Sequence, residues 1–296
     1  MDRKQVGRLL ALAALLAQCA PAQSRQNPSP MVEHTRAHRR IETVELPGTR
    51  HRLALGTLYI PRGLKLRDRM PLWVHFHGAP EVVESAAQHL RRLPVVTVQL
   101  GAGSAVYAKP FADPAAIRRL VAEAGQQAGE TFEPLILSSW SAGYGAIREI
   151  LRQPDLYAQV ERLLVLDSIH AGYVSGSPGP LESELVPADL ETWIRLANDA
   201  IAGRKRLLVT HSEVFPGTFA STTETADYLV RQVGANRWPV LKWGPVGMQQ
   251  LSEVRYGGLE IQGFAGNSAP DHVDHLHGIG DFMRRLLSGR RIPRLN

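Results

Sequence analysis

Residues 135–153, LILSSWSAGYGAIREILRQ, predict a strand that turns sharply into a helix. The apolar run 135–138 is typical of a strand that is buried on both faces of a parallel sheet. A helix is predicted over 142–153, because apolar residues recur there with a helical period and Pro154 then ends the pattern. A strand followed so closely by a helix indicates an α/β fold.

Ser141 lies at the centre of this turn. So tight a turn holds its central residue in a strained backbone conformation and tolerates only small residues two positions away. Ser139 and Gly143 meet that requirement. Ser141 is then expected to project above the sheet at a helix N-terminus, where the helix dipole and free N–H groups favour a developing negative charge. The pattern therefore indicates a candidate nucleophile.

The rest of the chain continues the alternation of strands and helices. Apolar runs predict further strands over 53–60, 72–76, 95–100, 163–166, 207–210 and 259–261. Helical periods predict helices over 113–124, 187–202, 222–233 and 281–287. We therefore expect one α/β domain over 50–296, with a mostly parallel central sheet and helices on both faces. Ligands of such sheets bind at the carboxyl ends of the strands, and residues 168–200, which begin Gly/Pro/Ser-rich, are a candidate lid there.

The first 22 residues have the order of a secretory signal peptide. Basic residues precede the apolar stretch 9–17, which is too short to span a membrane, and a small-residue cleavage site follows at 20–22. Cys19 sits in a sequence similar to a bacterial lipoprotein signal, but Gln18 is a poor residue before it and disfavours a lipid anchor. With a polar leader over 23–49, we expect a secreted or periplasmic protein with no stable membrane span.

Composition excludes several classes of protein. The 34 Lys+Arg and 28 Asp+Glu residues give a formal net charge of +6, with no long run of one sign. Nucleic-acid binding is therefore disfavoured. Because Cys19 is the only cysteine, a disulfide framework and a Cys-based zinc site are excluded.

Two motifs resemble the α/β-hydrolase superfamily of esterases, lipases and related serine hydrolases. One is the turn around Ser141, although Ser139 stands where the family usually has Gly. The other is the segment 75–79, HFHGA, which resembles the His-Gly segment of esterase oxyanion holes. The resemblance covers about residues 50–290 and implies that the N–H groups of Ala142 and of Gly78 or Ala79 stabilise the negatively charged intermediate, although Ala79 replaces a common second Gly.

The same resemblance implies a base and an acid that follow Ser141 in the chain, in the order acid and then histidine. The base is expected in the segment 271–277, DHVDHLH, where we favour His272 over His275, with His277 the weakest choice. For the acid we favour Asp167, at the end of an apolar strand, over Glu213, because a buried carboxylate needs a partner such as this histidine. The three histidines, with Asp271 or Asp274, also leave open a zinc site, but they lack a helical His-Glu-x-x-His motif.

These residues lead us to expect a serine hydrolase that cleaves carboxylic esters, of a small molecule or a carbohydrate, through an acyl-enzyme on Ser141 and without a cofactor. An acyltransferase or an amidase would use the same residues, and a catalytically silent binding protein could keep the fold. The residues expected to contact the substrate are His77, Tyr107, Trp140 and Tyr144.

Overall fold

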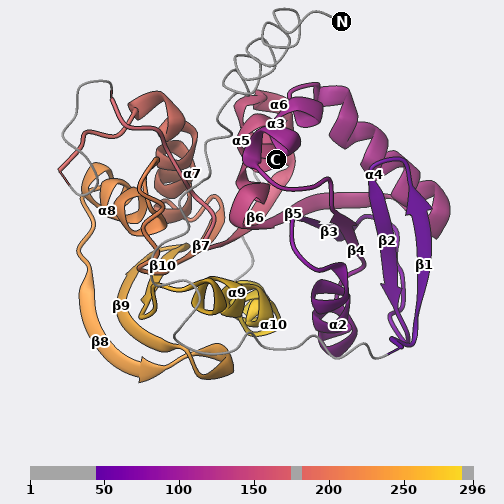
Figure 1. The fold of residues 1–296 in the computed structure, drawn as a ribbon. Helices are drawn as coiled ribbons and strands as arrows, with labels where there is room; N and C mark the ends of the chain where they lie inside the picture. Colours follow the sequence, from indigo (N-terminus) through magenta and orange to yellow (C-terminus); the bar gives the residue numbers. More distant parts are fainter. Residues whose placement is uncertain (1–44, 175–181, 289–296) are drawn as a thin grey trace, which may run out of the picture.

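A computed structural model describes residues 45–174 and 182–288 (Figure 1). The predicted signal peptide over 1–22, including Cys19, and most of the predicted leader over 23–49 lie outside the described residues. None of the helices that the structure describes is both long and apolar enough to cross a membrane.

The described residues form one sheet of ten strands in the order β1-β2-β4-β3-β5-β6-β7-β10-β9-β8. The six strands from β4 to β10 run parallel, whereas β1 and β2 at one end and β9 and β8 at the other are antiparallel. The strands are β1 Gly48–Leu53, β2 Gly56–Pro61, β3 Met70–Phe76, β4 Val95–Val98, β5 Phe132–Trp140, β6 Val160–Leu166, β7 Arg206–His211, β8 Trp238–Trp243, β9 Gln249–Tyr256 and β10 Leu259–Phe264.

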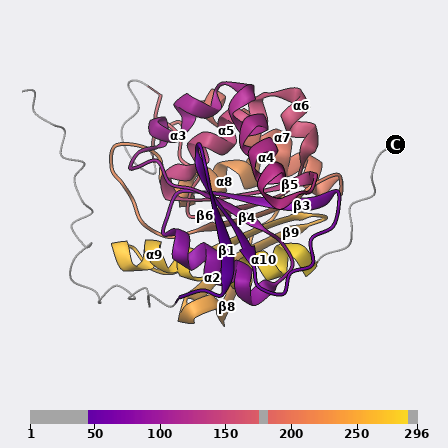
Figure 2. The same cartoon turned by 90° about the vertical axis from the view of Figure 1, so that its right-hand side faces the viewer.

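Helices cover both faces of this sheet (Figures 1 and 2). On one face lie α3 Ser104–Phe111, α4 Pro114–Ala128, α5 Tyr144–Arg152, α6 Pro154–Gln159, α7 Glu191–Ile201 and α8 Thr222–Gln232. On the other lie α2 Pro80–Leu90, α9 Ala269–His277 and α10 Ile279–Ser288. The predicted fold class, a mostly parallel central sheet between two layers of helices, is confirmed.

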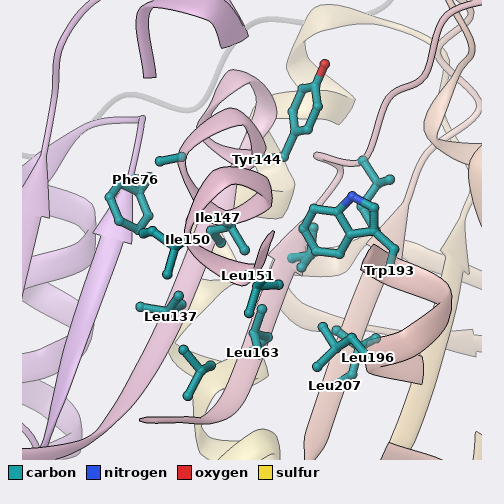
Figure 3. Packing of buried hydrophobic residues seen from close by; sticks show 14 of the residues in the cluster. Phe76, Leu137, Tyr144, Ile147, Ile150, Leu151, Leu163, Trp193, Leu196 and Leu207 are labelled. Atoms are coloured by element: carbon teal, nitrogen blue, oxygen red, sulfur yellow. The ribbon is translucent and has the colours of Figure 1, made fainter. Parts of the chain in front are cut away.

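Alternation along the strands divides the core into two layers. In β6, Leu163 packs with one set of helices, and its neighbour Leu164 packs with the other set. Successive side chains of a strand point to opposite faces, so a strand between two helical layers is apolar at nearly every position. Figure 3 shows the larger layer, where the sheet residues Leu137 and Leu207 meet helix residues such as Trp193.

The structure differs from the predicted elements in several places. Residues 53–60 are not one strand: β1 and β2 pair as a hairpin that reverses at 54–55. The strands β8 and β9 were not predicted, and neither were the helices α2, α3, α6 and α9. Within the candidate lid, 175–181 lie outside the described residues, and 191–201 form α7, whose apolar face packs into the core.

Candidate active site

Three polar residues follow three different strands at the carboxyl edge of the sheet. Ser141 follows β5, and Asp167 follows β6, the next strand in the sheet. His272 lies in α9, which comes after β10. Because parallel strands end at one edge, residues far apart in the chain meet there. Ser141, Asp167 and also His77, which follows β3, have φ angles of 50°, 44° and 68°. Such strain in residues other than glycine gathers at functional sites.

The turn at Ser141 fits against β3 and α3 because Gly143 and Gly145 follow it. A Cβ on Gly143 would lie 2.1 Å from the carbonyl oxygen of Phe76, and one on Gly145 would lie 2.2 Å from the carbonyl oxygen of Ser104. No side chain is compatible with either approach. The 3₁₀ turn Ser141–Gly143 leads directly into α5, so Ser141 lies at the start of a helical segment, as its sequence predicted.

Two buried serines tie this turn to the end of β6. The hydroxyl of Ser168 donates to the carbonyl oxygen of Ser141 at 2.6 Å. It has only one hydrogen, so its oxygen accepts the hydroxyl of Ser139, 2.8 Å away. Ser139 therefore has a role that a glycine cannot supply, which accounts for the departure from the family pattern. Sequence analysis missed Ser168, whose only signal is a hydroxyl beside a predicted strand end.

His272 and Asp167 are directly paired. Nδ1 of His272 lies 2.7 Å from Oδ2 of Asp167. A carboxylate can only accept, so Nδ1 carries a proton and donates it to this hydrogen bond. In the neutral imidazole, Nε2 is then unprotonated and is the basic nitrogen.

Asp167 is 1% exposed, yet it has enough partners to stay ionised. Its Oδ1 accepts the N–H of Ser212 at 2.8 Å and the hydroxyl of Thr222, while Oδ2 also accepts the hydroxyl of Ser212 at 2.6 Å. Burial opposes the charge, but the nearby His275 and His272 and the Ser212 hydroxyl outweigh it and hold the pKa of Asp167 well below its usual value. Ser212 and Thr222 were not singled out from the sequence.

Trp140 packs against the candidate base, whereas the prediction placed it in contact with substrate. Its ring stacks on His272, with centroids 4.6 Å apart, and also on His77, with centroids 5.2 Å apart. Its Nε1–H donates to the backbone carbonyl of His272 at 2.9 Å. Trp140 is absent from the described lining of the cavity beside Ser141. The residue before the candidate nucleophile thus fixes the candidate base.

Buried side chains support His77, which directly follows β3. Nε2 of His75 donates to the carbonyl oxygen of His77 at 2.6 Å, and Nδ1 of His77 lies 2.8 Å from the hydroxyl of Tyr107. Burial and the neighbouring His272 lower the pKa of His77 to about 4, so its ring is neutral near pH 7. Tyr107 is 0% exposed and supports His77 from within the core, and this burial argues against the substrate contact that was predicted for it.

The implied oxyanion-hole residues differ in their surroundings. Ala142 lines the cavity beside Ser141. The N–H of Gly78 donates to the side-chain oxygen of the exposed Gln99 at 2.9 Å. Ala79 precedes the first residue of α2, so it lies at a helix N-terminus. Of the three, Ala142 is the one among the described lining residues of this cavity.

A cavity of about 510 Å³ opens beside Ser141. Two of the four predicted substrate contacts, His77 and Tyr144, line it. The described lining residues are His77, Ala102, Gly103, Ser104, Ser141, Ala142, Tyr144, His170, Ala171, Gly172, Asp189 and Phe219. The cavity contains both aromatic and polar groups, as a substrate pocket does.

The alternative acid and bases have other surroundings. Glu213 is exposed, whereas Asp167 is the residue that pairs with His272. His275 is 1% exposed, and its Nδ1 lies 2.7 Å from the hydroxyl of Thr210. Within 45–174 and 182–288, no group of three His, Cys, Asp or Glu residues is placed to hold a metal ion, His277 included.

Comparisons with known proteins give likenesses of fold. No family model matches the chain, and no curated protein matches it. Among solved structures it is similar to carboxyl esterase 2 from Tuber melanosporum, with 16% identity over 93% of this chain and 97% of that one, at a TM-score of 0.44. It is also similar to carboxylesterase CesB from Bacillus subtilis, with 10% identity, coverage of 84% and 94%, and a TM-score of 0.46.

A third likeness is to an alpha-beta serine hydrolase homologue from Coxiella burnetii, with 14% identity, coverage of 82% and 99%, and a TM-score of 0.43. With identities this low, function has to be argued from the site itself.

Proposed function

We propose that this protein is a serine hydrolase that cleaves carboxylic esters through an acyl-enzyme on Ser141. The observation that carries the proposal is the hydrogen bond from Nδ1 of His272 to Oδ2 of the buried Asp167, at the edge where Ser141 turns toward a cavity. This pairing leaves Nε2 of His272 as a base, and a serine hydroxyl needs a base to become a nucleophile near neutral pH.

In the proposed reaction, Oγ of Ser141 attacks the ester carbonyl while Nε2 of His272 takes its proton. The carbonyl oxygen becomes negative and accepts the N–H of Ala142 together with an N–H from the Gly78–Ala79 segment. If Gly78 is that donor, the exposed Gln99 side chain must first release it. Each such donor contributes about 3 kcal/mol to the stability of the transition state.

The intermediate collapses when the C–O bond to the alcohol breaks and the leaving oxygen takes the proton from His272. Water then attacks the acyl group, His272 takes its proton, and the carboxylic acid leaves with the Ser141 hydroxyl restored. Asp167 keeps the imidazole in one tautomer and stabilises its charged form. The strained φ of Ser141 and the neutral His77 favour a site prepared for this chemistry.

The test is covalent labelling with a fluorophosphonate and hydrolysis of p-nitrophenyl acetate. We expect a label on Ser141 in the wild-type protein, and neither label nor turnover in Ser141→Ala. Ser85→Ala is the matched control, because Ser85 lies on α2 outside the site, and it should react as the wild type does. A folded wild-type protein that takes no label would be a silent binding protein and would overturn the proposal. An acyltransferase or amidase would take the label but prefer a different acceptor or leaving group.

A further inference from the structure

The cavity beside Ser141 is also lined by hydrogen-bond acceptors. His170 is one of the lining residues, with its ring edge-on to Tyr144 at 5.6 Å and to Phe219 at 4.9 Å between centroids. Nδ1 of His170 is 2.8 Å from the carbonyl oxygen of Ala220. A carbonyl only accepts, so Nδ1 carries the proton and, in the neutral ring, Nε2 is an acceptor. Burial lowers the pKa of His170, which keeps the ring neutral.

Asp189 adds a second acceptor to the same cavity. Oδ2 of its carboxylate accepts a hydrogen bond from the N–H of Gly172 at 2.9 Å, and Oδ1 accepts one from Nη1 of Arg148 at 3.2 Å. A carboxylate has about four acceptor sites, so accepting positions remain. The guanidinium of Arg148 offsets the charge of Asp189. In addition, the hydroxyl of Ser104 accepts the hydroxyl of Tyr144 at 3.2 Å and keeps its own hydrogen to donate.

This set of groups distinguishes between kinds of ligand. A purely aliphatic group would displace the water that donates hydrogen bonds to His170 and Asp189. It could not replace those hydrogen bonds, so its binding would be unfavourable. An anionic group would approach Asp189, and none of the described lining residues is Lys or Arg. A cationic group gains little, because Arg148 already pairs with Asp189. Neutral hydroxyl groups both donate and accept, and they suit the acceptors and the Ser104 hydroxyl together.

We propose that the cavity binds a neutral, hydroxyl-bearing part of the ester substrate and that Nε2 of His170 determines this specificity. The proposal rests on the proposed ester hydrolysis and adds to it the class of substrate. The hydroxylated part belongs either to the acyl group or to the alcohol, and the chemistry of recognition is the same in both cases.

The experiment compares esters in which methyl groups replace hydroxyl groups, one in the acyl pair and two in the alcohol pair. For the acyl side the pair is p-nitrophenyl 3-hydroxybutyrate and p-nitrophenyl 3-methylbutyrate. For the alcohol side it is glycerol monoacetate and 2-methylbutyl acetate, followed by acid release. We expect the wild-type kcat/KM to favour the hydroxylated member of one pair by about fivefold, the effect of one neutral hydrogen bond. That pair identifies the side of the substrate that the cavity binds.

The variant His170→Asn tests the residue itself. The amide nitrogen of Asn can still donate to Ala220, but the acceptor at Nε2 is lost, so the preference for the hydroxylated ester should disappear. His89→Asn is the matched control: Nδ1 of His89 also donates to a backbone carbonyl, that of Ser85 at 2.7 Å, on the exposed side of α2. It should keep the wild-type ratios.

Two results would overturn the specificity proposal: equal kcat/KM values within both pairs, or a preference that persists in a folded His170→Asn variant. If that variant does not fold, the wild-type ratios alone decide. Fluorophosphonate labelling separates the two proposals. A wild-type protein that labels at Ser141 but ignores the hydroxyl contradicts only the inference about His170, whereas a protein that takes no label contradicts the hydrolase itself.

Discussion

Replacing Asp167 with Asn tests the candidate site by changing one atom. Oδ1 of Asp167 accepts the N–H of Ser212 and the hydroxyl of Thr222, while Oδ2 accepts the hydroxyl of Ser212 and Nδ1–H of His272. The Ser212 N–H can only donate, so the amide oxygen of Asn must stay at the Oδ1 position. Its NH₂ group then takes the Oδ2 position and faces His272. Only an unprotonated Nδ1 can accept there, so the imidazole proton moves to Nε2.

An imidazole that carries its proton on Nε2 cannot take the proton of Ser141. We therefore expect kcat for p-nitrophenyl acetate to fall by about 10⁴-fold, the usual effect of this tautomer error. That loss corresponds to about 5.5 kcal/mol of activation free energy. The Ser212 hydroxyl can rotate to accept the new NH₂ group, so every polar group keeps a partner and the fold should persist.

The assays are steady-state kinetics, a thermal melt and ¹⁵N NMR of the imidazole, which reports the tautomer. Glu213→Gln is the matched control, because it makes the same change of carboxylate to amide on an exposed side chain. Its kcat should stay within about twofold of the wild type. The reasoning is refuted if Asp167→Asn keeps more than about a tenth of wild-type activity, or if its imidazole still carries the proton on Nδ1.

Two further predictions concern stability. In Gly143→Ala the new Cβ would lie 2.1 Å from the carbonyl oxygen of Phe76, so we expect at least about 3 kcal/mol of destabilisation and a Tm lower by about 6–12 °C, measured by calorimetry. Gly280→Ala, whose Cβ meets nothing nearer than 3.4 Å, should change the stability by no more than about 1 kcal/mol, and equal Tm values for the two variants would contradict this account. Burial lowers the pKa of His75 and of His211 to about 3 from 6.5, so the unfolded chain binds more protons between these values and the protein loses stability as the pH falls through this range. Urea unfolding should show about 2 kcal/mol lost for each histidine between pH 8 and 5, and a flat profile would count against it.

The fold could be predicted wherever one physical signal was dominant. The central strands are apolar at nearly every position because both faces are buried, and 163–166 within β6 is an example. The edge strand β8 was missed because it is largely exposed and contains Pro239, so neither an apolar run nor a clear alternation marks it. The hairpin β1–β2 was read as one strand, because Ala54-Leu55 at its turn is as apolar as the strands it joins.

The candidate site was predictable to the extent that its residues follow strands. Asp167 was favoured over Glu213 because a carboxylate at the end of an apolar strand needs a partner, and the structure places it against His272. Their catalytic roles stay a prediction. The roles of Trp140 and Ser139 could not be foreseen, because each depends on a contact with a distant element, α9 in one case and the end of β6 in the other.

The bond from Trp140 to His272 joins positions 132 residues apart, and this has a consequence for how the protein matures. A nascent polypeptide can complete β5 and its turn long before α9 is synthesised. Until that late segment docks, the indole lacks one of its stacking partners and, in the proposed mechanism, Ser141 lacks its proton acceptor. If the proposal is right, a chain that ends before α9 is expected to take no fluorophosphonate label.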